Sequence, residues 1–191
     1  ATTFLRYRPT AGGSPPGTTE VRFLQDDQAI YVGVRVAGTD DPVRARISPR
    51  EDINSDDQVG IYLDTFNDRR NGFGFSSNAQ GGMFDWQVTN DQPSNNWNGL
   101  WDVRTANFDG GWTAEFIIPF RSMRFKEGAT EWGVNFRRMV RWKNELTFLS
   151  QVPIAWGRRG LSKVSSAGTL IGIESPTHLR NVDVKPYALA S

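Results

Sequence analysis

Apolar and polar residues alternate with a period of two over much of the chain. Between residues 29 and 37, Ile30, Val32, Val34 and Val36 fall on one face. This alternation predicts β-strands with one buried face. The same pattern covers residues 43–47, 58–64, 73–75, 83–89, 112–118 and 132–141.

The pattern and the turn residues together predict the fold class. No segment has a convincing helical period, and only residues 120–125 suggest one helical turn after Pro119. The 19 glycines and 10 prolines suit many short strands joined by turns. We therefore predict an all-β fold, a two-sheet antiparallel β-sandwich of immunoglobulin-like or jelly-roll type. No repeat or boundary divides the chain, so we expect one domain over 1–191, with an exposed loop at 155–168 and a tail at 176–191.

Composition excludes several classes of function. The chain has 22 Lys and Arg against 21 Asp and Glu, a net charge of +1. This balance gives no excess of positive charge for binding nucleic acid or anionic lipid. Cysteine is absent, so disulfides, thiolate metal sites and cysteine nucleophiles are excluded. The single histidine, His178, is expected at the surface. No apolar run approaches the roughly 20 residues of a membrane helix, so we expect no direct membrane insertion by this domain.

Adjacent carboxylates are interpreted as turn formers, whose side chains bond their own backbone. A glycosidase needs two carboxyl groups facing each other across a cleft, and the sequence offers no such pair. We therefore expect no enzymatic activity and no catalytic residue. The adjacent pairs are Asp26-Asp27, Asp40-Asp41, Glu51-Asp52 and Asp56-Asp57.

Glu115 differs from these loop carboxylates because it lies in the middle of a predicted strand. We expect it to be buried and paired with Arg137 or Arg138. Buried pairs of this kind are most often structural, and losing one partner costs about 3–5 kcal/mol.

Calcium is the metal that the available ligands would suit, because they are hard oxygens. Asp64, Asn67 and Asp68 crowd one strand–loop junction, followed by Asn71. The alternative is that these residues only form turns, since no EF-hand spacing is present. A calcium site thus stays open, with Asp64, Asn67 and Asp68 as its candidate ligands.

The segment 90–102 is polar and rich in turns, yet it holds Trp97 and Trp101. Sugars stack their apolar faces on aromatic rings while polar side chains bind their hydroxyl groups. We therefore predict a carbohydrate site at Trp97 and Trp101, with Asn78, Asp85 and Arg104 as polar contacts. The alternative is that one of the tryptophans anchors the loop to the core.

Four segments resemble a known family. They are LDTFNDRRNGFGFSSNAQGGMFD (63–85), WNGLWDVRT (97–105), GGWTAEFIIPFRSMRF (110–125) and EWGVNFRRMVRWKNE (131–145). Together they resemble the family-9 carbohydrate-binding-module-like domain, in the version found at the N-terminal end of bacterial envelope proteins. In those proteins an outer-membrane β-barrel of unknown function follows, and the last residues here resemble the run into it.

The resemblance implies a β-sandwich, no enzymatic activity, and a location at the periplasmic face of the outer membrane or outside the cell. It leaves two hypotheses. The domain is a non-catalytic module that binds carbohydrate, or it is a periplasmic structural or protein-docking domain of an outer-membrane barrel protein with no small ligand. Exposure of the Trp97 and Trp101 rings beside polar groups would favour the first.

Overall fold

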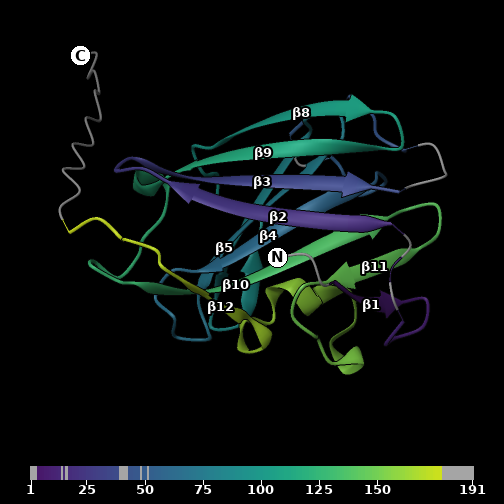
Figure 1. Ribbon diagram of the computed structural model, residues 1–191. Coiled ribbons are helices and arrows are strands. Elements are labelled where there is room, and N and C mark those ends of the chain that lie inside the picture. Colours follow the sequence, from purple (N-terminus) through teal and green to yellow (C-terminus); the bar gives the residue numbers. More distant parts are fainter. Residues whose placement is uncertain are drawn as a thin grey trace, which may run out of the picture.

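The computed structural model describes residues 4–13, 15, 17–38, 43–47, 49–50 and 52–177, which form two antiparallel sheets (Figure 1). Sheet A contains β1 (Leu5–Arg8), β4 (Gln58–Asp64), β5 (Gly72–Asn78), β6 (Met83–Thr89), β7 (Gln92–Ser94), β10 (Glu131–Val140), β11 (Glu145–Phe148) and β12 (Gly168–Ile171). Sheet B contains β2 (Thr18–Gln25), β3 (Ala29–Ala37), β8 (Asp102–Phe108) and β9 (Gly111–Pro119). The predicted two-sheet fold class is confirmed.

The strand order explains which segments meet. Sheet A runs β1-β11-β10-β4-β5-β6-β7, and β12 pairs with the first half of β10. Sheet B runs β2-β3-β9-β8. The pairing of β1 with β11 brings residues near the start of the chain beside residues 146–148. One end of sheet A is therefore built from segments far apart in the sequence.

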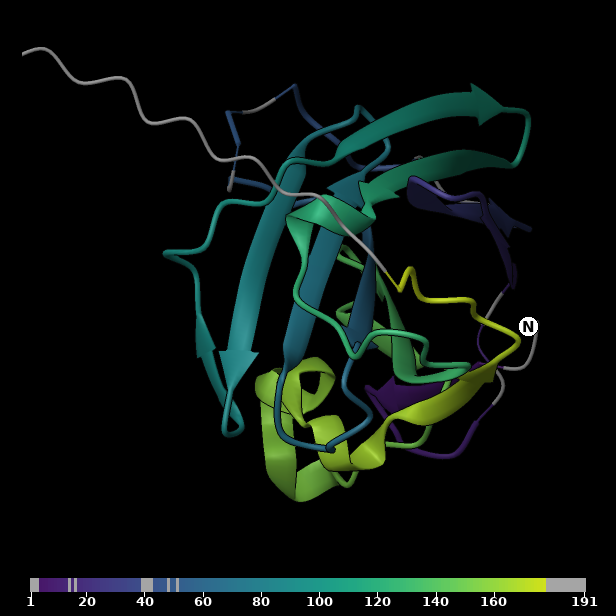
Figure 2. The same ribbon diagram turned by 90° about the vertical axis from the view of Figure 1, so that its left-hand side faces the viewer.

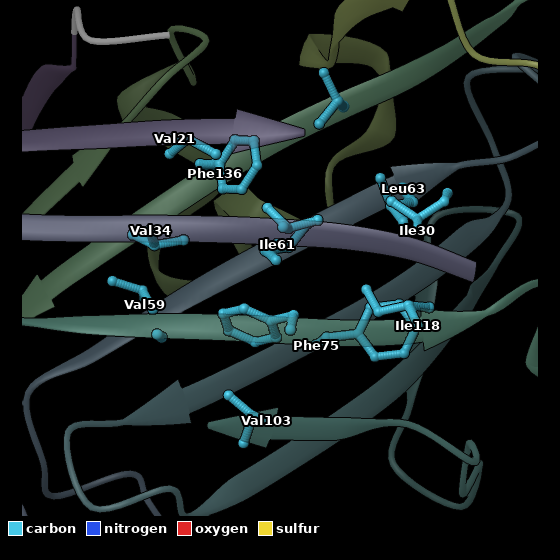
Figure 3. Close-up of a cluster of buried hydrophobic side chains, with 14 of the residues drawn as sticks. Val21, Ile30, Val34, Val59, Ile61, Leu63, Phe75, Val103, Ile118 and Phe136 are labelled. Atoms are coloured by element: carbon cyan, nitrogen blue, oxygen red, sulfur yellow. The ribbon is translucent and has the colours of Figure 1, made fainter. Parts of the chain in front are cut away.

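The main core lies between the two sheets (Figure 3). From sheet B, Ile30 and Ile118 are fully buried, as the alternation in β3 and β9 predicts. From sheet A, Ile61, Phe75 and Phe136 meet them. Burying such side chains contributes about 1.5–3 kcal/mol each, which makes this layer the main source of stability.

Sheet A is also covered on its second face, which the alternation does not predict. Every residue of β4 and β5 is buried. The cover consists of two 3₁₀ segments, η2 (Ile154–Ser162) and η3 (Val164–Ser166), with Leu161 and Val164 packed in a second apolar cluster. Figure 2 shows these segments beside the strands of sheet A, away from sheet B.

Some expected elements therefore require correction. The segment 155–168 is not an exposed loop, since it forms η2 and η3 over sheet A. Residues 43–47 are not a strand, although Val43 and Ala45 pack on the core. The expected helical turn is confirmed as η1 (Phe120–Ser122).

The expected burial of Glu115 is wrong. Glu115 is exposed on the outer face of sheet B, because its strand neighbours Ala114 and Phe116 occupy the inner face. Arg137 and Arg138 lie on β10 in the other sheet, so neither can be its partner. The charge that acts on Arg138 comes chiefly from Glu145, on the neighbouring strand β11.

Several residues singled out from the sequence lie outside the described residues: Asp40, Asp41, Glu51, His178 and the tail from residue 178 onward. Within the described part, no helix has the length and apolarity that a membrane-crossing helix needs.

Candidate functional site

A pocket of about 240 Å³ opens at the end of sheet A where β1, β4, β10 and β11 meet. Seven of its nine lining residues have polar or charged side chains, which include both hydrogen-bond donors and acceptors. The lining residues are Arg8, Asn54, Gln58, Arg137, Met139, Arg141, Asn144, Glu145 and Leu146.

Arg137 is the central cation of this pocket. Its Nη2 donates a hydrogen bond of 2.7 Å to Oε1 of Gln58, whose Nε2 donates to the carbonyl oxygen of Ile53 at 3.0 Å. The Nε of Arg137 is buried and has no partner among the described residues. Burial lowers the pKa of Arg137 to about 10, so the guanidinium remains charged at neutral pH.

Gly60 and Ser76 lie beside Arg137 on the same face of sheet A. A Cβ atom on Gly60 would lie 2.5 Å from Oγ of Ser76, 3.2 Å from Cδ2 of Leu161 and 3.7 Å from Nε of Arg137. Oγ of Ser76, like Nε of Arg137, is buried without a partner in the described part of the chain. Two unpaired polar atoms therefore converge above Gly60, and only glycine leaves room for them.

Glu145 is the one acidic residue among those that line the pocket. It is buried, and its Oε1 has no hydrogen-bond partner among the described residues. Burial raises the pKa of Glu145, and the positive charges of Arg138, Arg6 and Lys143 offset part of that rise. Glu145 is paired with Val140 in the strand register, so its side chain lies on the same face of sheet A as Arg138 and not on the face of Arg137.

The raised pKa of Glu145 predicts a pH-dependent stability. The folded chain binds this proton more tightly than the unfolded chain, so the free energy of unfolding falls as the pH rises from the ordinary value of 4.5 through the higher folded-state value. Glu145→Gln removes this dependence. The unfolding free energy of the variant minus that of the unmodified chain should therefore increase between about pH 4 and pH 7, by about 1.4 kcal/mol for each unit of pKa difference.

Urea denaturation at both pH values checks this. Glu20→Gln on β2, where the glutamate side chain is 40% exposed, is the control. A difference for Glu145→Gln that stays constant with pH would contradict the prediction.

The structure places Trp97 and Trp101 at one end of the main core. Trp101 is 7% exposed and stacks on Phe116 at a centroid distance of 5.7 Å. Trp97 is partly buried and packs on Phe73 and Phe75 at 4.9 and 5.8 Å. The expectation of two exposed rings is therefore wrong for Trp101, because its ring packs over one end of the core between the sheets.

Asp85 does lie beside the tryptophan loop, as an anchor. Its fully buried carboxylate accepts hydrogen bonds from Nη2 and Nε of Arg50 at 2.6 and 3.1 Å, and from the backbone N–H of Gly99 at 2.7 Å. The Arg50 guanidinium also lies 5.8 Å from the ring centre of Trp101. The oxygens of Asp85 are thus occupied by groups that hold the loop in place.

The other two predicted contacts are not brought together with these groups. The Nδ2 of Asn78 donates to Asp56 at 2.7 Å and to the carbonyl of Arg46, and its Oδ1 accepts from the turn at Gly82. Arg104 is exposed on β8 and lies opposite Glu115 in the strand register. Asn78 is therefore occupied in the turn, and Arg104 belongs to the outer face of sheet B.

The candidate calcium ligands bind their own loop. Asp64 accepts the backbone N–H groups of Asp68 and Arg69 at 3.2 and 2.8 Å, and Asp68 accepts those of Arg70 and Asn71, both at 2.8 Å. Burial raises the pKa of Asp64. Among the described residues, no three His, Cys, Asp or Glu side chains are grouped to hold a metal ion. Turn formation accounts for these residues, and calcium stays a prediction.

Sequence reasoning missed the pocket because its lining comes from segments as distant as Arg8 and Leu146. Two signals were present. Arg137 lies within an otherwise regular strand pattern and Arg141 follows it, and Gly60 interrupts the side-chain series of β4. A glycine inside a strand indicates close approach by another group, but the sequence does not show which segment or ligand supplies it.

The described fold is a two-sheet β-sandwich with a pocket at one end of sheet A. The model of the family described as carbohydrate family 9 binding domain-like matches residues 5–146. The chain therefore belongs to this family. A comparison with curated proteins gives no match.

Solved structures show the same fold at low sequence identity. A carbohydrate-binding module of family 9 from Caldicellulosiruptor kristjanssonii in complex with glucose is 16% identical, with a TM-score of 0.56, over 90% of this chain and 83% of that one. Its complex with cellotriose gives 16% and 0.55, over 97% and 88%. A presumed carbohydrate-binding protein from Bacteroides uniformis gives 17% and 0.66, over 90% and 85%.

Proposed function

We propose that this domain is a non-catalytic carbohydrate-binding module of a bacterial cell-envelope protein, and that the sugar binds in the pocket formed by β1, β4, β10 and β11. The observation that carries the proposal is the set of polar side chains in that pocket, where Asn54, Gln58 and Asn144 line the same pocket as Arg137. Amide and guanidinium groups together match the donors and acceptors of sugar hydroxyls.

The size and surroundings of the pocket support this choice. Its 240 Å³ is below the roughly 300–1,000 Å³ of sites for larger ligands, and suits one sugar ring or the end of a chain. Trp142, in the turn between the lining residues Arg141 and Asn144, is 39% exposed. The Lys143 ammonium lies 4.6 Å from the centre of the Trp142 ring. We propose that a second sugar ring stacks on this tryptophan.

The family and its solved structures support the same class of ligand. The Caldicellulosiruptor module was solved with glucose and with cellotriose. We extend that ligand class to this chain. We also propose that the domain works at the periplasmic face of the outer membrane, joined to an outer-membrane barrel, as the resemblance of its segments implies.

Calorimetric titration with glucose and cellotriose tests the proposed site. Asn54 is exposed and lines the pocket, so Asn54→Ala removes one polar contact without disturbing the core. Losing a hydrogen bond worth about 0.5–1.5 kcal/mol should weaken binding about two- to twelvefold. Trp142→Ala should weaken cellotriose binding more than glucose binding.

Asn107→Ala is the matched control, since Asn107 is exposed on β8 in the other sheet. It should leave both affinities unchanged. Binding that survives Asn54→Ala and Trp142→Ala but is lost in Trp97→Ala would place the sugar at the tryptophan loop and overturn the proposed site. No binding of either sugar, or of a wider glycan panel, would favour the alternative of a docking domain without a small ligand.

A further inference from the structure

Positive charge is concentrated at the pocket, although the whole chain has a net charge of only +1. Arg8, Arg137 and Arg141 line the pocket, and the one acidic residue that also lines it, Glu145, has its side chain on the face of Arg138. None of these three arginines forms an ion pair with a described residue. Arg6 and Lys143 add further positive charge acting on Glu145.

The nearby carboxylates are already occupied and do not neutralise these arginines. Asp57 is buried and accepts the backbone N–H groups of Arg141 at 2.5 Å and Arg44 at 2.9 Å. The positive charge of Arg138 acts on Glu145, and both side chains lie on the face of sheet A opposite to that of Arg137. The guanidinium groups in the pocket are therefore left without counter-charges from the described chain.

Of the three arginines, Arg137 places the strictest requirement on the group that a ligand presents to it. Its only hydrogen bond to a described residue goes to the neutral amide oxygen of Gln58, and its Nε, beside the unpaired Oγ of Ser76, has no acceptor there. A guanidinium is a planar fork of donors that fits a carboxylate, sulfate or phosphate through two parallel hydrogen bonds. A neutral hydroxyl offers only one acceptor atom and no counter-charge.

We propose that the pocket selects a sugar bearing a negatively charged group, and that Arg137 pairs with this group while Arg8 and Arg141 contribute attraction. This inference rests on the proposed function and specifies its ligand class: acidic carbohydrate, such as a uronic acid or a sulfated sugar. Asn54 and Asn144 then bind the hydroxyl groups of the same ring.

The test compares sugars that differ only in this group. Methyl β-D-glucuronide, the 6-O-sulfate of methyl β-D-glucoside and methyl β-D-glucoside itself are titrated by calorimetry. At least one acidic sugar should bind about tenfold more tightly than the neutral one, and the tighter of the two identifies the group. Raising the salt concentration about tenfold should reduce this preference, because salt screens charge pairs and leaves neutral contacts largely unchanged.

Variants assign the preference to the arginines. Arg137→Gln should bring the affinity ratio of acidic to neutral sugar close to one, and Arg137→Lys should keep only part of it because the ammonium lacks the planar fork. Arg141→Gln, in the more accessible turn, should lower the ratio by a few fold without endangering the fold. Arg104→Gln on the exposed face of sheet B is the matched control and should leave the ratio unchanged.

The outcomes separate this inference from the function on which it rests. Equal or tighter binding of the neutral glucoside overturns the inference and leaves the carbohydrate-binding function standing. A preference for acidic sugars that survives in both Arg137→Gln and Arg141→Gln places the charged group elsewhere and also overturns it. If none of the three sugars binds, the inference fails, and the titrations with cellotriose and the wider glycan panel decide the proposed function.

Discussion

Replacing Gly74 by alanine should lower the free energy of unfolding by about 3 kcal/mol, the upper end of the usual cost of overpacking. A Cβ atom on Gly74 would lie 2.0, 2.1 and 2.4 Å from Cε2, Cζ2 and Cδ2 of Trp86. The Trp86 ring is buried in the second apolar cluster of sheet A, so it has little room to move. Urea denaturation measures the loss.

Gly33→Ala is the matched control, because Gly33 is also in a central strand but a Cβ atom there would meet nothing within 4 Å. It should be neutral or stabilise the protein by up to about 1 kcal/mol, since alanine reduces the entropy of the unfolded chain. Similar losses in both variants would show that backbone freedom, and not the Trp86 ring, decides the effect at Gly74.

Gly60 and Gly74 explain why the sequence predicts one face of sheet A and not the other. The inner faces of β3, β4 and β9 carry regular apolar series, so their period of two identifies both the strands and the core between the sheets. On the second face of sheet A, Gly60 and Gly74 stand where apolar side chains would complete such a series. Their space is filled from neighbouring segments, by Leu161 of η2 and Trp86 of β6, and a local pattern contains no sign of this.

For the candidate site, the sequence could predict the types of residue involved but not their position. Aromatic and polar residues do occur together in the segment 90–102, but composition does not show which way a ring points. Trp101 faces the core because Phe75 and Phe116 leave an open end there that a large ring covers. The polar pocket instead depends on strand order, which joins Arg8 of β1 to the end of β10 through β11. Such long-range pairing follows from the whole fold.

Arg50→Ala should lower the free energy of unfolding by about 3 kcal/mol, the lower end of the cost of stranding one member of a buried ion pair. Its partner Asp85 is fully buried, whereas 37% of the Arg50 side chain is exposed. Removing the guanidinium leaves the carboxylate with only the N–H of Gly99 as a described partner. The variant also removes the cation beside Trp101, which loosens the tryptophan loop.

A double-mutant cycle tests the origin of this loss. Asp85→Asn in the Arg50→Ala background should recover part of the stability, because the buried side chain is then neutral. Arg22→Ala, at a side chain that is 83% exposed, should change stability by less than about 0.5 kcal/mol. No recovery in the double variant would show that the stranded charge is not the cause. Sugar affinity of the folded Arg50→Ala protein should be unchanged if the ligand binds at Arg137, and should be lost if it binds at the tryptophan loop.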